Sequence, residues 1–121
     1  MTQPLSGTRV LIVEDDAIIA INASDMLEEI GCRTAAIAAT VDEALKRAGD
    51  TEFDIALLDL NLKDEDSLPV ARRLRDDGKP FIFATGYTGL PSGSGFTDAM
   101  MISKPYRIDQ LAAMLARAMA D

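Results

Sequence analysis

The chain has 121 residues, of which 48% are apolar and 26% charged, and it carries a net charge of −8. We expect residues 1–121 to form one domain, with 1–7 as an N-terminal tail, because this length leaves no room for an effector module. The negative charge argues against nucleic acid as a partner. No apolar run is long enough for a membrane span, and the start lacks the features of a signal peptide, so we expect a cytoplasmic protein.

Cysteine and histidine usage excludes several kinds of site. Cys32 is the only cysteine and histidine is absent. This composition therefore excludes an internal disulfide, a cysteine-based zinc site and a histidine-dependent catalytic triad within these 121 residues. We expect Cys32 to be inert, at the mouth of a buried strand.

Short apolar runs alternate with segments of helical periodicity along the chain. Strands are expected over residues 9–13, 33–38, 55–58, 81–84 and 99–102. Helices are expected after Asp16 up to a stop at Gly31, from a capping box at Thr40–Glu43 through Ala48, from near Ser67, and after Pro105. Their inward positions are expected at Ile19, Ala23, Met26, Leu27, Ile30, Leu68, Ala71, Leu74, Ile108, Leu111, Leu115 and Met119.

This alternation predicts an α/β fold, a doubly wound parallel sheet covered by helices on both faces. Its size suits the flavodoxin-like strand order 2-1-3-4-5, and no dinucleotide-binding glycine motif follows the first strand. Residues 62–66 are expected to form an acidic loop. Four glycines and a proline within 86–96 make a poor helix, so we expect the fourth helix to be short or absent, as a mobile loop or a single turn.

Asp59 directly follows the continuous apolar run of residues 55–58. A carboxylate at the tip of a buried strand costs free energy unless it meets a cation or a hydrogen-bond network. We therefore interpret Asp59 as a nucleophile that accepts a phosphoryl group.

Other polar residues are expected at the same edge of the sheet. Glu14 and Asp15 follow the first strand, Thr85 follows the fourth and Lys104 follows the fifth. Open α/β sheets bind ligands beyond the carboxyl ends of their strands, so these residues should meet in one crevice. Each has an ordinary structural explanation alone, as a helix cap, a packed threonine or a solvated lysine; their coincidence favours a site.

The residue types suit phosphoryl transfer. Three carboxylates without histidine or cysteine form a hard oxygen site that favours Mg²⁺. With the metal on one phosphoryl oxygen, Lys104 and Thr85 can each hold another, and Gly86 leaves room for the group.

Four motifs together resemble the receiver domain of bacterial two-component response regulators. They are Val-Glu-Asp-Asp, Leu-Leu-Asp-Leu-Asn, Ala-Thr-Gly and Ser-Lys-Pro-Tyr, and the resemblance covers roughly residues 8–120. It implies Mg²⁺-dependent phosphorylation of Asp59 by a sensor histidine kinase or a histidine phosphotransfer protein. It also implies a signal to a downstream protein target, and no enzyme activity beyond the protein's own phosphorylation and dephosphorylation.

The resemblance also assigns roles within the site. Asp15 matches a direct metal ligand, Glu14 a ligand through water, and Asn61 the residue that lends its backbone carbonyl to the metal. Thr85 matches the switch hydroxyl and Lys104 the phosphate contact, with a cis bond to Pro105 expected. The acid pair could instead be read as Asp15-Asp16, but the family pair directly follows the strand, which favours Glu14-Asp15.

Two departures from the usual receiver pattern stand out. Met101 occupies the position of the usual aromatic switch residue, and a glycine-rich segment replaces the fourth helix. Together with Phe-Ala-Thr-Gly-Tyr at residues 83–87, they resemble the single-domain "FAT GUY" subgroup. Tyr87 could replace the missing aromatic residue, gate water, or simply pack on the loop.

Two other functions are compatible with parts of this pattern. A pseudo-receiver would dock a partner without phosphorylation, although the complete set of site residues weighs against it. A phosphatase with an aspartyl nucleophile usually carries a second acid two residues later. Here Asn61 occupies that position.

Overall fold

The computed structural model describes residues 5–86, 95–96 and 101–120. Its main element is a five-stranded parallel sheet in the order β2-β1-β3-β6-β7, which confirms the order expected from the sequence. The strands are β1 Arg9–Val13, β2 Arg33–Ala38, β3 Ile55–Asp59, β6 Phe81–Thr85 and β7 Met101–Ser103. The helices are α1 Ala17–Ile30, α2 Val41–Asp50, α3 Leu68–Asp76 and α4 Ile108–Ala120.

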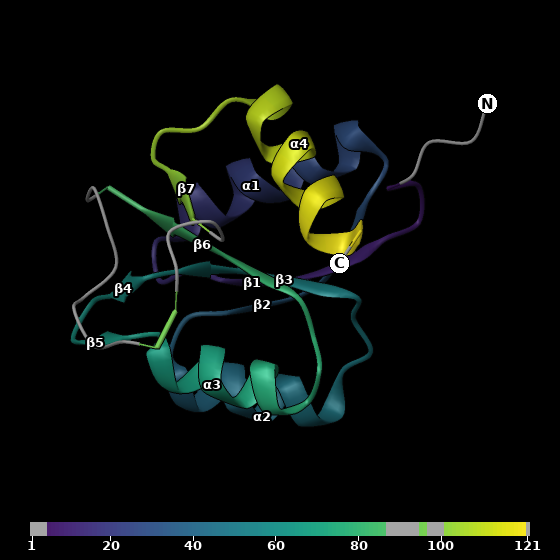
Figure 1. The fold of residues 1–121 in the computed structure, drawn as a ribbon. Helices are drawn as coiled ribbons and strands as arrows, with labels where there is room; N and C mark the ends of the chain where they lie inside the picture. The colour runs from purple at the N-terminus through teal and green to yellow at the C-terminus, as the bar shows by residue number, and fades with distance from the viewer. Residues whose placement is uncertain (1–4, 87–94, 97–100, 121) are drawn as a thin grey trace.

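Helices cover both faces of the sheet, with α1 and α4 on one side and α2 and α3 on the other (Figure 1). Side chains alternate between the two faces along each strand. In β6, Phe81 and Phe83 join the core under α2 and α3, whereas Ile82 and Ala84 join the core under α1 and α4. Both cores consist almost entirely of aliphatic and aromatic side chains, so the polar candidate residues lie at the ends of the strands.

The α1 helix begins and ends with the expected capping residues but presents an unexpected face. Asp16 accepts hydrogen bonds from the first-turn backbone N–H groups, and Gly31 ends the helix in the left-handed conformation. Ala20 and Ala23 are buried against the sheet, whereas Ile19 is 37% exposed, so its expected inward position is wrong. The small alanine side chains allow α1 to pack closely against the sheet, and in this orientation of the helix Ile19 faces outwards.

Two details of the other helices differ from expectation. Met119 is 38% exposed and Ala118 is buried in its place, because Leu111, Leu115 and Ala118 form the continuous inward stripe. The α2 helix does not stop at Gly49 but runs to Asp50. A glycine in the last turn is tolerated there because the helical backbone hydrogen bond across it, from Thr51 to Arg47, still forms.

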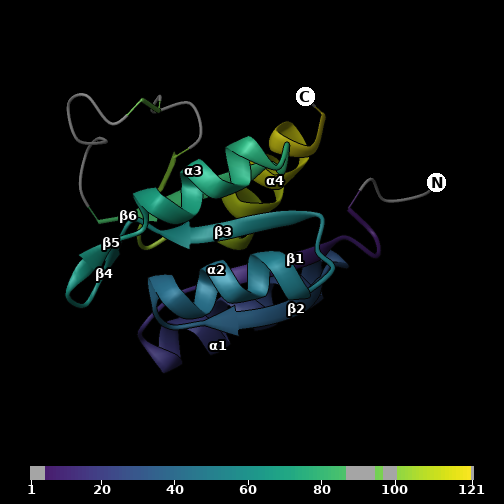
Figure 2. The ribbon, with the colours of Figure 1, turned by 90° about the horizontal axis from the view of Figure 1, so that it is seen from below.

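The segment after β3 is a hairpin rather than the acidic loop expected for residues 62–66. Strands β4 Asn61–Leu62 and β5 Glu65–Asp66 pair antiparallel. Figure 2 shows them beyond the tip of β3. Leu62 is 5% exposed and packs into the core under α2 and α3, so an apolar anchor organises the acidic segment.

Phe96 anchors the chain between β6 and β7 to the rest of the fold. Its ring centroid lies 5.5 Å from those of both Phe81 and Phe83, with edge-to-face geometry, and the Arg75 guanidinium carbon lies 4.8 Å from its centroid. The expectation of a loop or single turn falls mainly on residues 87–94 and 97–100, which lie outside the described residues together with Tyr87.

Two remaining expectations concern Cys32 and membranes. Cys32 directly precedes β2, the position expected for it, and it is buried. Its Sγ donates a weak hydrogen bond to the Leu5 carbonyl, and burial raises the pKa of its thiol. Within the described part of the chain, every helix is too short or too polar to cross a membrane.

Candidate phosphoacceptor and metal site

An acidic cluster lies at the carboxyl edge of the sheet. The parallel register that places Val13 beside Leu58 brings the residues that follow them to the same level. Oxygen atoms of Glu14, Asp15 and Asp59 lie within 4.8 Å of one another. Asp16 instead caps α1, so the structure groups the first two acids of the run with Asp59.

Lys104 enters this cluster from the end of β7. Its Nζ lies 2.8 Å from Glu14 Oε1 and 3.2 Å from Asp59 Oδ2. The Lys104 backbone N–H donates to the Thr85 carbonyl, which fixes the start of the lysine segment against the end of β6. The bond from Lys104 to Pro105 is cis, as expected.

Burial and charge shift the pKa values in opposite ways. Burial raises the pKa of Glu14 above its ordinary value, and the hydrogen bond from Lys104 offsets only part of this effect. Burial alone would lower the pKa of Lys104, but its contacts with Glu14 and Asp59 outweigh burial and raise it. The three carboxylates outnumber the single ammonium by two charges, which leaves the cluster suited to a divalent cation.

The donor set fits magnesium on chemical grounds. All three side chains offer carboxylate oxygens, the hard ligands that Mg²⁺ prefers over zinc. Glu14 is 6% exposed and Asp59 8%, whereas Asp15 is exposed, so an ion could reach the cluster from solvent while keeping some of its water.

The segment after Asp59 folds back onto its carboxylate. The Asn61 backbone N–H donates to Asp59 Oδ1 at 3.2 Å. Asn61 is exposed and lies at the same edge as the acid cluster, as expected, and the metal-binding role of its carbonyl stays a prediction.

The remaining predicted site residues are placed as follows. Thr85 is the last residue of β6, 1% exposed, and follows Ala84, which pairs with Asp59 in the sheet. Gly86 is exposed, and a Cβ atom there would meet nothing within 4 Å. Met101 pairs with Phe83 and packs into the core under α2 and α3, away from the acid cluster.

Tyr106 belongs to the surroundings of the site but received no role from the sequence. It lines a small cavity together with Glu14 and Asp59, and burial raises the pKa of its phenol. The sequence signal that could have identified Tyr106 is its position two residues after Lys104, because the residues next to a lysine in a site also lie near that site.

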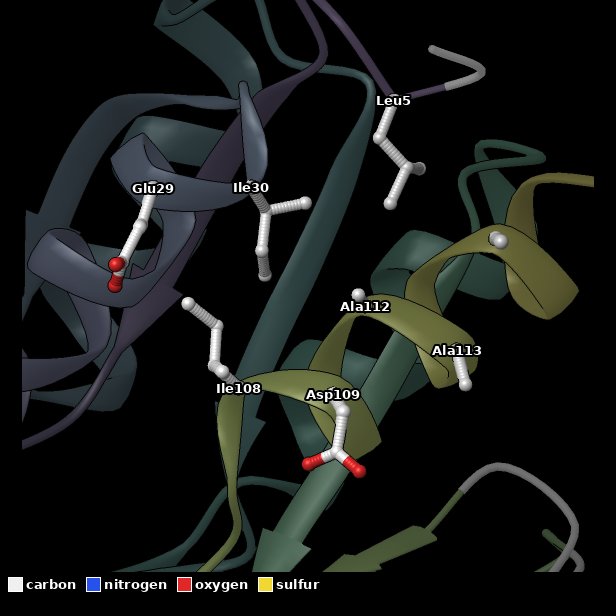
Figure 3. Close-up of a pocket in the computed structure, with 8 residues that line it drawn as sticks. Leu5, Glu29, Ile30, Ile108, Asp109, Ala112 and Ala113 are labelled. Atoms are coloured by element: carbon white, nitrogen blue, oxygen red, sulfur yellow. The ribbon is translucent and has the colours of Figure 1, made fainter.

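Two grooves flank α1. One of about 370 Å³ adjoins the site and is lined by Ile19, Met26, Lys104 and Tyr106, among others. The other, of about 510 Å³, lies between α1 and α4, where Leu5, Ile30 and Ile108 point into it (Figure 3). The second groove shares no residue with the acid cluster and is largely aliphatic, so it contributes nothing to chemistry at Asp59.

Comparison with known proteins agrees with this geometry. The model of the response regulator receiver domain matches residues 10–116, and the chain therefore belongs to this family. It is 32% identical over 122 residues to the aerobic respiration control sensor protein ArcB of Escherichia coli K12, covering 94% of this chain and 15% of that protein.

Two solved structures show how similar the folds are. SdrG from Sphingomonas melonis Fr1 has a TM-score of 0.82 and 37% identity, with both chains covered completely. The response regulator PhyR from Brucella abortus has a TM-score of 0.81 and 27% identity, over 96% of this chain and 49% of that one. The chain thus spans about half of PhyR and a small part of ArcB.

Proposed function

We propose that this chain is a receiver that takes a phosphoryl group onto Asp59 from a phosphohistidine of a sensor kinase or phosphotransfer protein. The observation that carries the proposal is the position of the Asp59 carboxylate, which lies within 4.8 Å of the acid pair and 3.2 Å from the Lys104 ammonium, a group that also contacts Glu14. Glu14, Asp15, Asp59 and the Asn61 carbonyl are the proposed Mg²⁺ ligands.

The reaction is a single phosphoryl transfer. An Asp59 carboxylate oxygen forms the new P–O bond while the P–N bond to the donor histidine breaks, and the freed ring nitrogen takes its proton from solvent. Lys104 holds one phosphoryl oxygen and the Thr85 hydroxyl another, so negative charge is met by fixed donors. Glu14, Asp15, Asp59 and the Asn61 carbonyl would hold Mg²⁺, which would supply positive charge beside the phosphoryl group.

The output of the site is proposed to pass to another protein. Addition of about two negative charges at Asp59 draws Thr85 and Lys104 towards the phosphoryl group. With methionine at 101, we assign this chain to the Phe-Ala-Thr-Gly-Tyr subgroup, and Tyr87 and Gly86 to its switch. A phosphorylation-independent docking module is the weaker alternative, because nothing in such a module requires Asp59, Thr85 and Lys104 at one edge.

The direct test is phosphoryl labelling with and without Mg²⁺. We expect the chain to gain a base-labile acyl phosphate from acetyl phosphate when Mg²⁺ is present, and none when the metal is chelated. Intact-mass spectrometry and amide spectra with beryllofluoride measure the two effects independently. The proposal is contradicted if labelling continues when Mg²⁺ is chelated, or if the chain responds to neither acetyl phosphate nor beryllofluoride.

An apolar surface beside the site suits the phosphohistidine donor. Ile18 is 72% exposed and Ile21 56%, both in the first half of α1, whose cap adjoins the acid cluster. Ile19 lines the adjoining groove that Lys104 and Tyr106 also form. We infer that this surface docks a helical donor protein, because an apolar helix face against α1 would leave its histidine free to face Asp59.

Replacing Ile18 by glutamine should separate docking from chemistry. We expect transfer from a phosphorylated histidine kinase domain that labels the parent to fall about tenfold, through loss of one apolar contact. Labelling by acetyl phosphate should stay unchanged. Ile37→Gln is the matched control, since Ile37 is 41% exposed but lies on the edge strand β2. Equal rates of transfer to Ile18→Gln and Ile37→Gln would show that Ile18 on α1 is not part of the docking surface.

A further inference from the structure

One hydrogen bond joins the β4–β5 hairpin to a different part of the fold. Glu65 Oε2 accepts from the backbone N–H of Val41 at 3.0 Å, across 24 residues of sequence. Val41 is the first residue of α2, where an N–H group has no partner within the helix and a carboxylate is favoured by the helix dipole.

The base of the hairpin is fixed independently of Glu65. The Leu60 carbonyl accepts from the Ser67 backbone N–H at 2.9 Å and lies 3.4 Å from the Ser67 hydroxyl. Ser67 is fully buried and Leu60 is 3% exposed. This contact closes the hairpin onto β3, and Leu62 of β4 packs into the core that also contains Val13, whereas Glu65 of β5 bonds the start of α2.

The β1 side of the site is tied to the start of α2. The Glu14 backbone N–H donates to the Ala38 carbonyl at 2.9 Å, at the end of β2. Two residues separate Ala38 from Val41, and the Thr40 hydroxyl caps the helix by accepting from Glu43. The bond between Glu65 and Val41 therefore connects Glu14 to the hairpin, through the end of β2 and the start of α2.

The two ends of this connection, Glu14 and the hairpin, adjoin the two halves of the proposed metal site. Glu14 and Asp15 lie on the β1 side, while Asp59 and the Asn61 carbonyl lie on the β3 side, at the base of the hairpin. Mg²⁺ requires near-ideal octahedral geometry, so its affinity depends on how well these halves are held relative to each other.

We propose that Glu65 is a positioning residue for the metal site, which holds the Asn61 segment at its distance from the β1 acids through its bond to the α2 N-terminus. The inference rests on the proposed function, because it concerns the same metal site. Glu65 itself lies outside the cluster of possible ligands.

The bond can be removed from either partner. Glu65→Ala removes the acceptor. Val41→Pro removes the donor while keeping a residue favoured at the first helical position, and Thr40 already has the extended backbone that must precede proline. We expect each variant to weaken Mg²⁺ binding about fivefold, below the effect of a direct outer-shell partner because Glu65 acts through the backbone. The double variant should be no weaker than either single variant.

Mg²⁺ dissociation constants from amide chemical shifts provide the readout, together with thermal unfolding of each variant. Glu65→Gln retains an acceptor and should restore affinity, whereas an equal loss in Glu65→Gln would show an effect of charge and overturn the proposal. Thr51→Ala changes the opposite end of α2, away from the hairpin, and should leave affinity unchanged. If Glu65→Ala does not fold, Val41→Pro alone decides the result.

The outcomes also separate this inference from the proposed function. A parent chain that binds Mg²⁺ and becomes labelled at Asp59, with affinity unchanged in Glu65→Ala and Val41→Pro, overturns the role of Glu65 alone. A parent that binds no Mg²⁺ overturns both.

Discussion

Replacing Asp59 by asparagine is expected to abolish phosphoryl labelling from both acetyl phosphate and a phosphohistidine donor. The carboxamide is neutral and a poor nucleophile, and it removes one of the three acids in the cluster. Mass spectrometry of the intact chain should show complete loss of the adduct. The folded state should survive, because the substitution also removes repulsion between neighbouring carboxylates.

Asp54→Asn is the matched control for this change. Asp54 directly precedes β3, while Asp59 ends it, so the two acids lie at opposite ends of one strand. Asp54 bonds Arg9, and that guanidinium lowers the pKa of the Asp54 carboxyl. The control variant should be labelled like the parent. Labelling of Asp59→Asn at the parental rate would show that another residue accepts the phosphoryl group.

Replacing Lys104 by methionine should change phosphorylation and metal binding in opposite directions. Labelling should slow by about 10²-fold, because a cation that holds a phosphoryl oxygen is lost. Mg²⁺ affinity should rise, since the ammonium 2.8 Å from Glu14 and 3.2 Å from Asp59 no longer competes for these carboxylates. Labelling rates and calorimetric Mg²⁺ titrations measure the two effects.

Lys46→Met serves as the control because Lys46 is an exposed lysine on α2. It should alter neither quantity, apart from the small effect of one surface charge. A Lys104→Met variant that labels normally would remove Lys104 from the phosphoryl site. A decrease in its Mg²⁺ affinity would show that the ammonium assists the metal instead of competing with it.

The sheet and the meeting of site residues were predictable because they follow from strand ends. A buried parallel strand needs a continuous apolar run, and the polar residue after it must emerge at the carboxyl edge. Asp59 after residues 55–58 and Glu14 after residues 9–13 illustrate this rule. The register of β1 and β3 then brings them together without further information.

Other features depended on information that local patterns do not contain. The first half of α1 contains isoleucines at 18, 19 and 21, so periodicity could not decide which stripe faces the core; the small alanines at 20 and 23 did. The hairpin after β3 has only two residues in each strand, too few for a periodic signal. The bond between Glu65 and Val41 depends on the tertiary arrangement of distant segments.

The ion pair between Glu14 and Lys104 joins residues that are made at different times during synthesis of the chain. The two residues are separated by 90 positions, so the contact joins the first strand to a segment near the end of the chain. During synthesis, β1, β3 and β6 can emerge and pair while Glu14 and Asp59 still lack their lysine. A nascent or truncated chain that ends before residue 104 lacks the counterion that both acids contact in the complete fold. Charge neutralisation of the phosphoacceptor pocket therefore requires the last part of the chain, the same part that supplies β7 and α4.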